Sequence, residues 1–116
     1  MSTYTEIEVE IKSKGLTAPR VTPQSIEDII VAENYFTVGE ACEALHQPTH
    51  PATKLLTMCI LVLRNGFTIV GKSACASPEN FDASLGRKIA RQDAVNQIWP
   101  LEGYRLRSEL AANAPV

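Results

Sequence analysis

The sequence predicts an α+β fold, and three features of its pattern support this class. Two apolar segments, residues 54–63 and 67–75, flank Asn65-Gly66, an arrangement typical of a β-hairpin. Apolar residues then recur every four positions, as expected for a long helix over residues 78–98. The pattern shows no regular βαβ alternation and no internal repeat. We therefore expect a small antiparallel sheet centred on the hairpin, packed against this helix and against shorter N-terminal helices.

The first 20 residues are expected to form an extended arm or strand. Ile7, Val9 and Ile11 alternate with glutamates, and this alternation has the period of a half-exposed strand. Such a strand would pair with a partner, within or between subunits. A frayed terminus is the alternative, because terminal segments are ordered only when other contacts hold them.

Shorter helices are predicted between this arm and the hairpin. Thr22-Pro23 provides an N-cap followed by proline in the first turn, and the apolar spacing after it predicts a helix over residues 23–34. A second helical stretch, residues 38–45, is acidic, which argues against a DNA-binding helix-turn-helix. The prolines of residues 46–51 indicate a loop, and its two histidines lack the rigid spacing of a metal site.

The hairpin and the long helix form the expected core. The first strand of the hairpin is apolar at nearly every position, which is typical of a strand covered on both faces, here by the helix and by another subunit. On the helix, Phe81, Leu85 and Ile89 share one face.

Prolines and small residues set the limits of the long helix. Ser77-Pro78 predicts its first turn, and Pro100 is expected to end it. A last helical turn is expected within residues 101–110, followed by a flexible tail at residues 111–116.

Composition limits the classes of function. A chain of 116 residues with 45% hydrophobic residues is enough for one domain, residues 1–116, and small domains often cover apolar surface by homo-oligomerisation. A net charge of -2 argues against a protein that coats nucleic acid. Three cysteines without CxxC spacing predict neither a metal site nor disulfides. Without an apolar segment of membrane-spanning length or a signal-peptide core, no membrane association is expected.

Motifs of catalysis and of cofactor binding are not found in the sequence. It contains no GxSxG, no HExxH and no Cys/His pair at an informative spacing. Its glycines form neither a P-loop nor a dinucleotide-binding fingerprint. We therefore expect a binding protein that has no cofactor and is not an enzyme.

Several separate motifs occur in order within residues 20–107. They are Arg64-Asn65-Gly66-Phe67-Thr68, Ser73-Ala74-Cys75, Ser77-Pro78-Glu79-Asn80-Phe81-Asp82, Gly86-Arg87-Lys88-Ile89-Ala90 and Ile98-Trp99-Pro100-Leu101-Glu102-Gly103-Tyr104. Through these motifs the chain resembles the family of phage proteins typified by gene 49 of phage N4 and gene 66 of phage Sf6. It is also similar to the first family of Thoeris anti-defence proteins, which are phage sponges that sequester cyclic ADP-ribose isomers made by bacterial TIR enzymes.

The resemblance implies a function and an assembly. It implies a homo-oligomer, dimer or hexamer, in the host cytoplasm that binds a small cyclic nucleotide-derived signal without hydrolysing it. Cyclic oligonucleotides from related defence systems are further ligands that it implies.

A signal of this kind carries adenine and a pyrophosphate, so its receptor needs a plane for stacking and donors for phosphate. Each candidate also has a structural interpretation: Phe81 can belong to the core, Asn80 can cap the helix, and the basic residues can form a solvated face. The candidate ligand-binding residues are Asn80, Phe81, Arg87, Lys88, Arg91, Arg105 and Arg107.

Two other functions remain open from the sequence. The chain can be a protein-interaction module whose hairpin and helix inhibit a host protein. It can also be an accessory DNA-binding phage protein, although its acidic balance speaks against nucleic acid as a partner.

Overall fold

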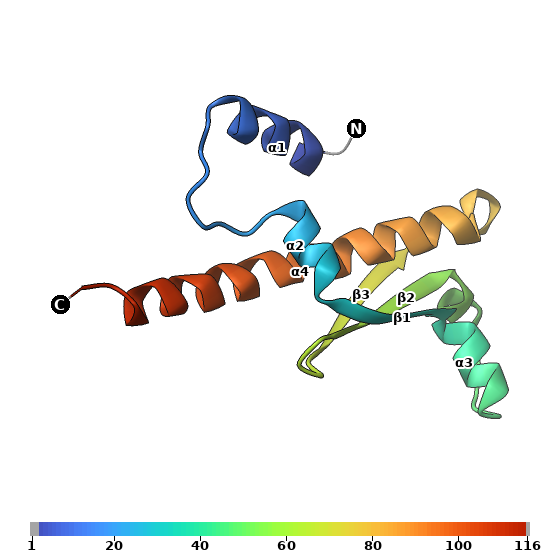
Figure 1. Ribbon diagram of the computed structural model, residues 1–116. Coiled ribbons are helices and arrows are strands. Elements are labelled where there is room, and N and C mark those ends of the chain that lie inside the picture. Colours follow the sequence, from blue (N-terminus) through green and yellow to red (C-terminus); the bar gives the residue numbers. More distant parts are fainter. Residues whose placement is uncertain (1–2, 116) are drawn as a thin grey trace. The chain divides into compact units, whose positions relative to one another are not determined.

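A computed structural model describes residues 3–115, which form two compact units. One unit comprises Ile30–Gln97 and contains the sheet; the other combines Met1–Ile29 with Ile98–Val116. Helix α4 (Ala83–Ala112) contributes residues to both (Figure 1). None of the helices within the described residues is long and apolar enough to cross a membrane.

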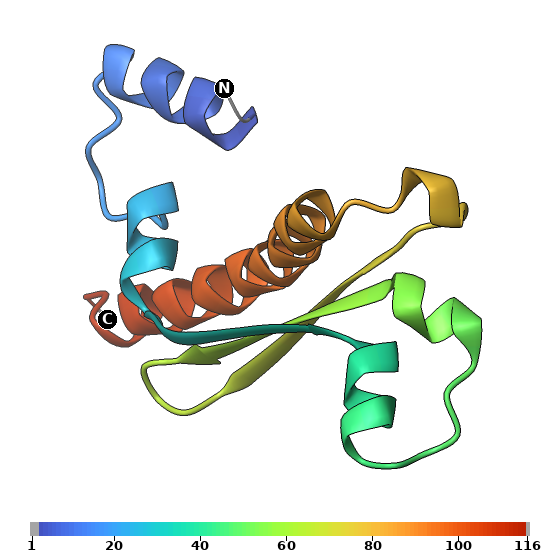
Figure 2. The same cartoon turned by 90° about the vertical axis from the view of Figure 1, so that its right-hand side faces the viewer.

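The sheet of the first unit has three antiparallel strands. They are β1 (Ile30–Thr37), β2 (Leu56–Leu63) and β3 (Thr68–Ala74), with β2 in the centre (Figure 2). The hairpin of β2 and β3 is confirmed, and Gly66 occupies its turn with a φ of 88°, a conformation that favours glycine. The predicted α+β class is therefore correct.

One face of the sheet packs against α4. Along β2, buried residues alternate with half-buried ones, and Cys59, Leu61 and Leu63 belong to the buried set. Small residues of α4, Ala90 and Ala94, are fully buried and allow the helix to approach the sheet closely. We expected β2 to be covered on both faces. Within the described residues, only the face toward α4 is fully buried.

The helix predicted over residues 23–34 is wrong in its second half. Helix α2 spans only Pro23–Asp28, with Thr22 as its N-cap in a capping box with Ser25. The next residues form β1, which pairs with β2 along its length. Its β-branched and aromatic side chains favour a strand, and pairing with an apolar central strand outweighs the helical spacing of the sequence.

Between β1 and β2 the structure has a short helix followed by a loop, close to the helix predicted over residues 38–45 and the loop predicted over residues 46–51. Helix α3 (Val38–Ala44) begins at Thr37, whose hydroxyl accepts a hydrogen bond from the backbone N–H of Glu40. The loop that follows contains the short 3₁₀ helix η1 (Pro51–Leu55), capped by the side chain of His50.

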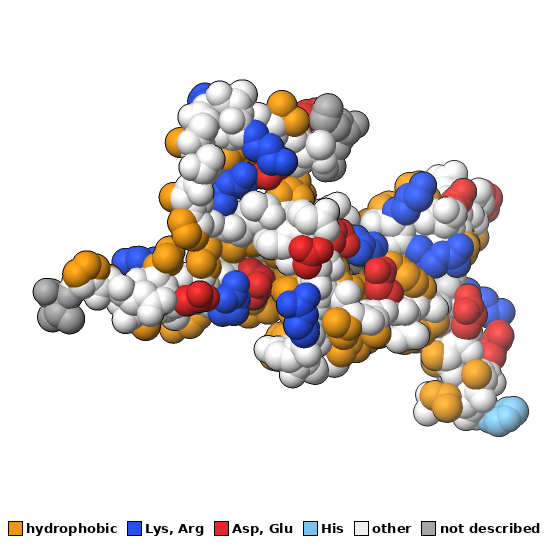
Figure 3. Space-filling view, viewed as in Figure 1, with side chains coloured by type: hydrophobic (Ala, Val, Ile, Leu, Met, Phe, Trp, Pro, Cys, Tyr) orange, Lys and Arg blue, Asp and Glu red, His pale blue; other side chains and the backbone are white. Residues whose placement is uncertain are grey.

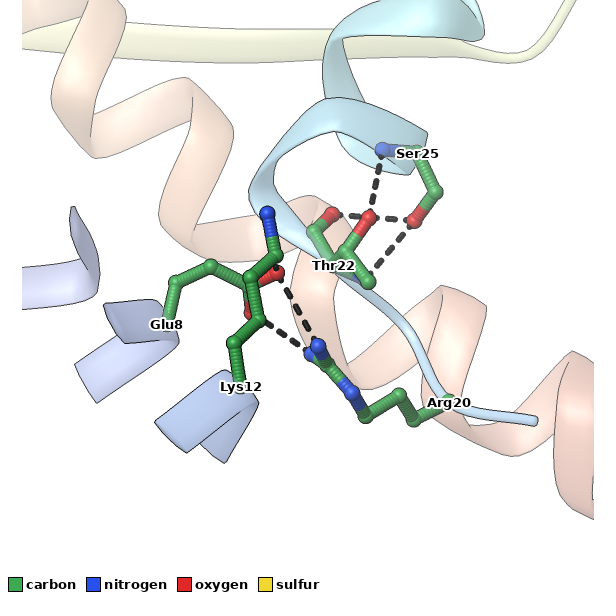
Figure 4. A network of polar contacts seen from close by, with 5 residues as sticks. All are labelled: Glu8, Lys12, Arg20, Thr22 and Ser25. Atoms are coloured by element: carbon green, nitrogen blue, oxygen red, sulfur yellow. Dashed lines mark hydrogen bonds and ion pairs between the residues drawn. The ribbon is translucent and has the colours of Figure 1, made fainter. Parts of the chain in front are cut away.

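The expected N-terminal strand is a helix, α1 (Thr3–Ser13). The alternating pattern hides two Glu–Lys pairs at i,i+4, Glu8–Lys12 at 3.9 Å and Glu10–Lys14 at 3.1 Å, and such pairs stabilise helices. Glu8 also accepts two hydrogen bonds from Arg20, beyond the helix (Figure 4). Met1 and Ser2 of the predicted arm lie outside the described residues.

Helix α4 differs from the prediction at both ends. It begins at Ala83, after the 3₁₀ helix η2 (Pro78–Asn80), and continues through Pro100. Proline removes one backbone hydrogen bond and its ring crowds the carbonyl of the preceding turn, but it does not always end a helix. Ion pairs from Arg105 to Glu102 and Glu109 stabilise the turns that follow. Of the predicted tail, Ala111 and Ala112 belong to α4, and Val116 lies outside the described residues.

Candidate functional site

Two neighbouring pockets lie within the unit Ile30–Gln97, and both are lined by Thr57 and Phe81. The first, which we call the Asn80 pocket, has a volume of about 220 Å³. The second, the Arg87 pocket, has a volume of about 40 Å³. The walls of the Asn80 pocket also include Ser73, Cys75, Asp82, Leu85 and Ile89, and those of the Arg87 pocket include Tyr35, Thr37 and Glu40.

Thr57 is the unusual residue of this site. It lies on the helix-facing side of β2, and only 2% of its surface is exposed. Its hydroxyl has no hydrogen-bond partner within residues 3–115. Because a buried hydroxyl without a partner costs about 1–3 kcal/mol, an arrangement of this kind is uncommon unless another group completes it.

Gly86 explains how α4 can cover this hydroxyl. A Cβ atom at Gly86 would lie 2.8 Å from the Oγ1 atom of Thr57, closer than real Cβ atoms approach. Glycine in a helix costs about 1 kcal/mol relative to alanine, and the close approach to Thr57 accounts for its presence here.

The apolar face predicted for the long helix is not the face that packs on the sheet. Leu85 is 54% exposed and Ile89 is 48% exposed, and both line the Asn80 pocket. The sheet is covered by Gly86, Ala90 and Ala94 instead. Phe81 is half-buried and lines both pockets, so it is available to a ligand and is not enclosed in the core.

Asn80 and Asp82, the residues before and after Phe81 in the chain, also line the Asn80 pocket. The backbone N–H of Asn80 donates to the carbonyl oxygen of Ser77, and its side chain lines the pocket. Asp82 accepts a hydrogen bond from the backbone N–H of Leu85 at 2.9 Å. This bond caps α4, so the first turn of the helix is already supplied with an acceptor.

Arg87 contributes a cation to the second pocket. Its side chain lines the Arg87 pocket and, within the described part of the chain, forms no hydrogen bond or ion pair. A guanidinium is well suited to phosphate, because it donates two parallel hydrogen bonds. The adjacent Lys88 is exposed and lines neither pocket.

Arg91, one turn farther along α4, lines neither pocket and is bound to an acidic side chain. Its Nε atom donates to Oε1 of Glu33 at 2.9 Å, and a second hydrogen bond of 3.3 Å reaches Oε2. The hydroxyl of Tyr35 donates to the same carboxylate at 2.6 Å. The hydrogen bond from Arg91 and then that from Tyr35 lower the pKa of Glu33. Burial and the hydrogen bond to Glu33 raise the pKa of Tyr35.

Arg105 and Arg107 belong to the other unit, and neither lines the two pockets. Arg105 is held by Glu102 at 3.0 Å and by Glu109 at 2.8 Å. Arg107 is exposed. On the face shown in Figure 3, basic and acidic side chains are interspersed and do not gather into one basic patch.

Sequence reasoning did not select Thr57, Tyr35, Ser73 or Glu40 for this site. The sequence pattern could have indicated Thr57 alone. It is a polar residue at one of the alternating positions of an apolar strand that face the core. Tyr35 and Ser73 join the pockets through strand pairing across β2, where Thr57 lies between Thr37 and Ser73, and Glu40 lies in the first turn of α3.

The side chains of this site offer several kinds of contact to a ligand. Phe81 offers a face for stacking, Thr57 and Asn80 offer hydrogen bonds, and Arg87 offers a charge. Among residues 3–115, no group of three histidine, cysteine or acidic side chains is placed to hold a metal ion.

Comparison with known proteins gives one match. The family described as "Phage protein (N4 Gp49/phage Sf6 gene 66) family" matches residues 21–110. No curated protein matches the chain, and no solved structure matches it.

Proposed function

The chain belongs to the Phage protein (N4 Gp49/phage Sf6 gene 66) family, and from this membership we propose that it is a counter-defence sponge. It binds a small cyclic nucleotide-derived immune signal in the host cytoplasm and withholds it without hydrolysis. The resemblance to Thoeris anti-defence proteins suggests a cyclic ADP-ribose isomer as the ligand, with cyclic oligonucleotides as further candidates.

One observation carries this proposal: the buried hydroxyl without a partner belongs to Thr57, which lines the Asn80 pocket with Phe81 and the Arg87 pocket with Phe81 and Arg87. A base that stacks on Phe81 and enters the Asn80 pocket would lie next to Thr57, and it would supply the missing hydrogen bond once α4 moves away from the hydroxyl at Gly86. A phosphate on the same ligand would then reach Arg87. Base, hydroxyl and phosphate contacts together favour a nucleotide over a purely apolar ligand.

The size of the site is suited to part of such a signal. Pockets that enclose a whole drug-sized ligand usually measure about 300–1,000 Å³. A volume of about 220 Å³ is therefore appropriate for one base, while the rest of the ligand extends toward Arg87.

A second subunit would complete the enclosure. Leu85 and Ile89 at the pocket wall are half-exposed and apolar. Association into a dimer or hexamer would cover these side chains and would place several sites in one particle. Sequestration lowers the free signal only when binding sites outnumber signal molecules, so a multivalent particle suits this task.

The test is calorimetric titration of the purified protein with cyclic ADP-ribose isomers and cyclic dinucleotides, followed by chromatography of the ligand released by heat. Stoichiometric binding with intact ligand is the expected result. Recovery of a cleaved ligand would make the protein an enzyme. Lack of binding to every compound would exclude the sponge and would favour the protein-interaction module.

A further inference from the structure

One of the basic residues on α4, Arg91, forms an ion pair with a carboxylate on β1, that of Glu33. Arg87 and Arg91 are four residues apart, so they lie on one face of the helix with Cβ atoms about 6 Å apart. Glu33 and Tyr35 lie two residues apart on β1 and therefore on one face of the strand. Tyr35 lines the Arg87 pocket, and Glu33 holds Arg91.

From this geometry we propose that Glu33 competes with the ligand for Arg91. Without ligand, the carboxylate of Glu33 binds the guanidinium of Arg91. When a diphosphate binds Arg87 through its first phosphate, its second phosphate replaces Glu33 at Arg91. This inference rests on the proposed function and adds a specificity determinant to it. Glu33 acts through Arg91 and is a positioning residue.

The contacts of Glu33 resemble those of a bound phosphate. A carboxylate that accepts hydrogen bonds from a guanidinium at 2.9 and 3.3 Å uses the same donors that a phosphate would use. The Tyr35 hydroxyl, at 2.6 Å, keeps the carboxylate in place and would remain as its partner after Arg91 is released. The pair is also partly open, with the side chains of Arg91 and Glu33 28% and 36% exposed.

This arrangement predicts a selectivity between ligands. A monophosphate needs Arg87 alone and does not disturb Glu33. A diphosphate gains Arg91 but has to displace Glu33, so its affinity is reduced by the strength of the internal pair. For pairs as exposed as this one, that strength corresponds to about a two- to fivefold change in affinity.

The experiment compares the wild type with Glu33→Gln, which removes the charge and keeps the shape and an acceptor for Tyr35. The probes are cyclic ADP-ribose, a diphosphate, and 3′,5′-cyclic AMP, a monophosphate. Glu33→Gln is expected to bind cyclic ADP-ribose about two- to fivefold more tightly, with a steeper loss of affinity as salt is raised, and to leave cyclic AMP unchanged.

Three further variants isolate the role of Glu33. Glu33→Asp retains the charge and should restore most of the wild-type selectivity. Adding Arg91→Gln to Glu33→Gln should abolish the gain for cyclic ADP-ribose. Glu43→Gln is the matched control, because it removes the same charge from an ion pair between α3 and η1, with Lys54, that involves no residue of α4.

The outcomes separate the two proposals. If the wild type binds cyclic ADP-ribose and Glu33→Gln binds it no better, Glu33 is not a competitor, and the sponge remains. If only Glu33→Gln binds, the competitor role holds, and the wild-type chain is not a sponge for this ligand. If neither protein binds either probe, both proposals are overturned.

Discussion

Gly71 on β3 lies directly against Ala94 on α4, where the helix crosses the sheet. A Cβ atom at Gly71 would lie 2.6 Å from the backbone nitrogen of Ala94 and would overlap the carbonyl oxygen of Ala90. The neighbouring atoms are backbone, which cannot move aside as a flexible side chain can. This contact sets how closely the helix can approach the sheet.

Gly71→Ala should accordingly be destabilising. Overpacking of this kind costs about 1–3 kcal/mol in the free energy of unfolding, and here the upper part of that range is expected. Chemical denaturation followed by circular dichroism measures the effect.

Gly103→Ala is the control for that substitution. Gly103 lies within α4 with open space around its Cβ position, so alanine should stabilise the helix by about 1 kcal/mol. Equal stability of Gly71→Ala and the wild type would contradict the close packing described here.

Thr57→Val is expected to change stability and binding in opposite directions. Valine has nearly the shape of threonine but no hydroxyl, so it removes a buried group that has no partner. The unfolding free energy should rise by about 1–3 kcal/mol, while affinity for the bound nucleotide should fall. Thermal unfolding and calorimetric titration of the same preparation test both. A variant that is more stable and binds equally well would remove Thr57 from the site.

Arg87→Gln and Lys88→Gln form a matched pair of adjacent substitutions with the same change in charge. Only Arg87 lines a pocket, so only its loss should weaken nucleotide binding, by about 1.5–3 kcal/mol for a hydrogen bond to a charged group. Titration at two salt concentrations separates this contact from general electrostatic attraction. Equal losses in the two variants would indicate a diffuse effect of charge.

The attachment of α1 should depend on pH through Glu8. Two hydrogen bonds from Arg20, at 2.6 and 3.0 Å, lower the pKa of Glu8 below its ordinary value of 4.5. A group whose pKa is lower in the folded state stabilises that state above the ordinary pKa. The contribution is lost as the pH falls through the folded value.

Trp99 provides a probe of this transition, because it is the sole tryptophan and its ring stacks on Tyr4 of α1 with centroids 4.9 Å apart. Its fluorescence should change between about pH 4.5 and lower values in the wild type. The change should be reduced in Glu8→Gln. Glu10→Gln, on the same helix and paired only with Lys14 in the described contacts, should behave as the wild type does.

The sequence predicted those elements whose signals are local. Asn65-Gly66 indicated the hairpin, and Thr22-Pro23 indicated the start of α2, because turn and cap preferences depend on a few neighbouring residues. β1 was missed because its stability comes from pairing with β2, a contact distant in sequence. α1 was misassigned because alternation and i,i+4 ion pairs coexist in the same segment.

The candidate site was predicted only in part for a similar reason. Asn80, Phe81 and Arg87 were selected by residue type and line the two pockets. The sequence could not reveal that Glu33, 58 residues before Arg91, binds this cation. Nor could it reveal that small residues, and not Leu85 and Ile89, form the packed face of α4. Which face of α4 packs on the sheet depends on how closely the helix approaches the sheet.

Helix α4 also closes one edge of the sheet to other strands. Its Asp93 side chain accepts the backbone N–H of Lys72 at 2.9 Å, and its Gln97 side chain donates to the carbonyl oxygen of Val70 at 2.7 Å. Both backbone groups belong to β3, an edge strand, where groups of this kind otherwise recruit foreign chains. These two contacts therefore protect this edge of the sheet against aggregation by strand addition.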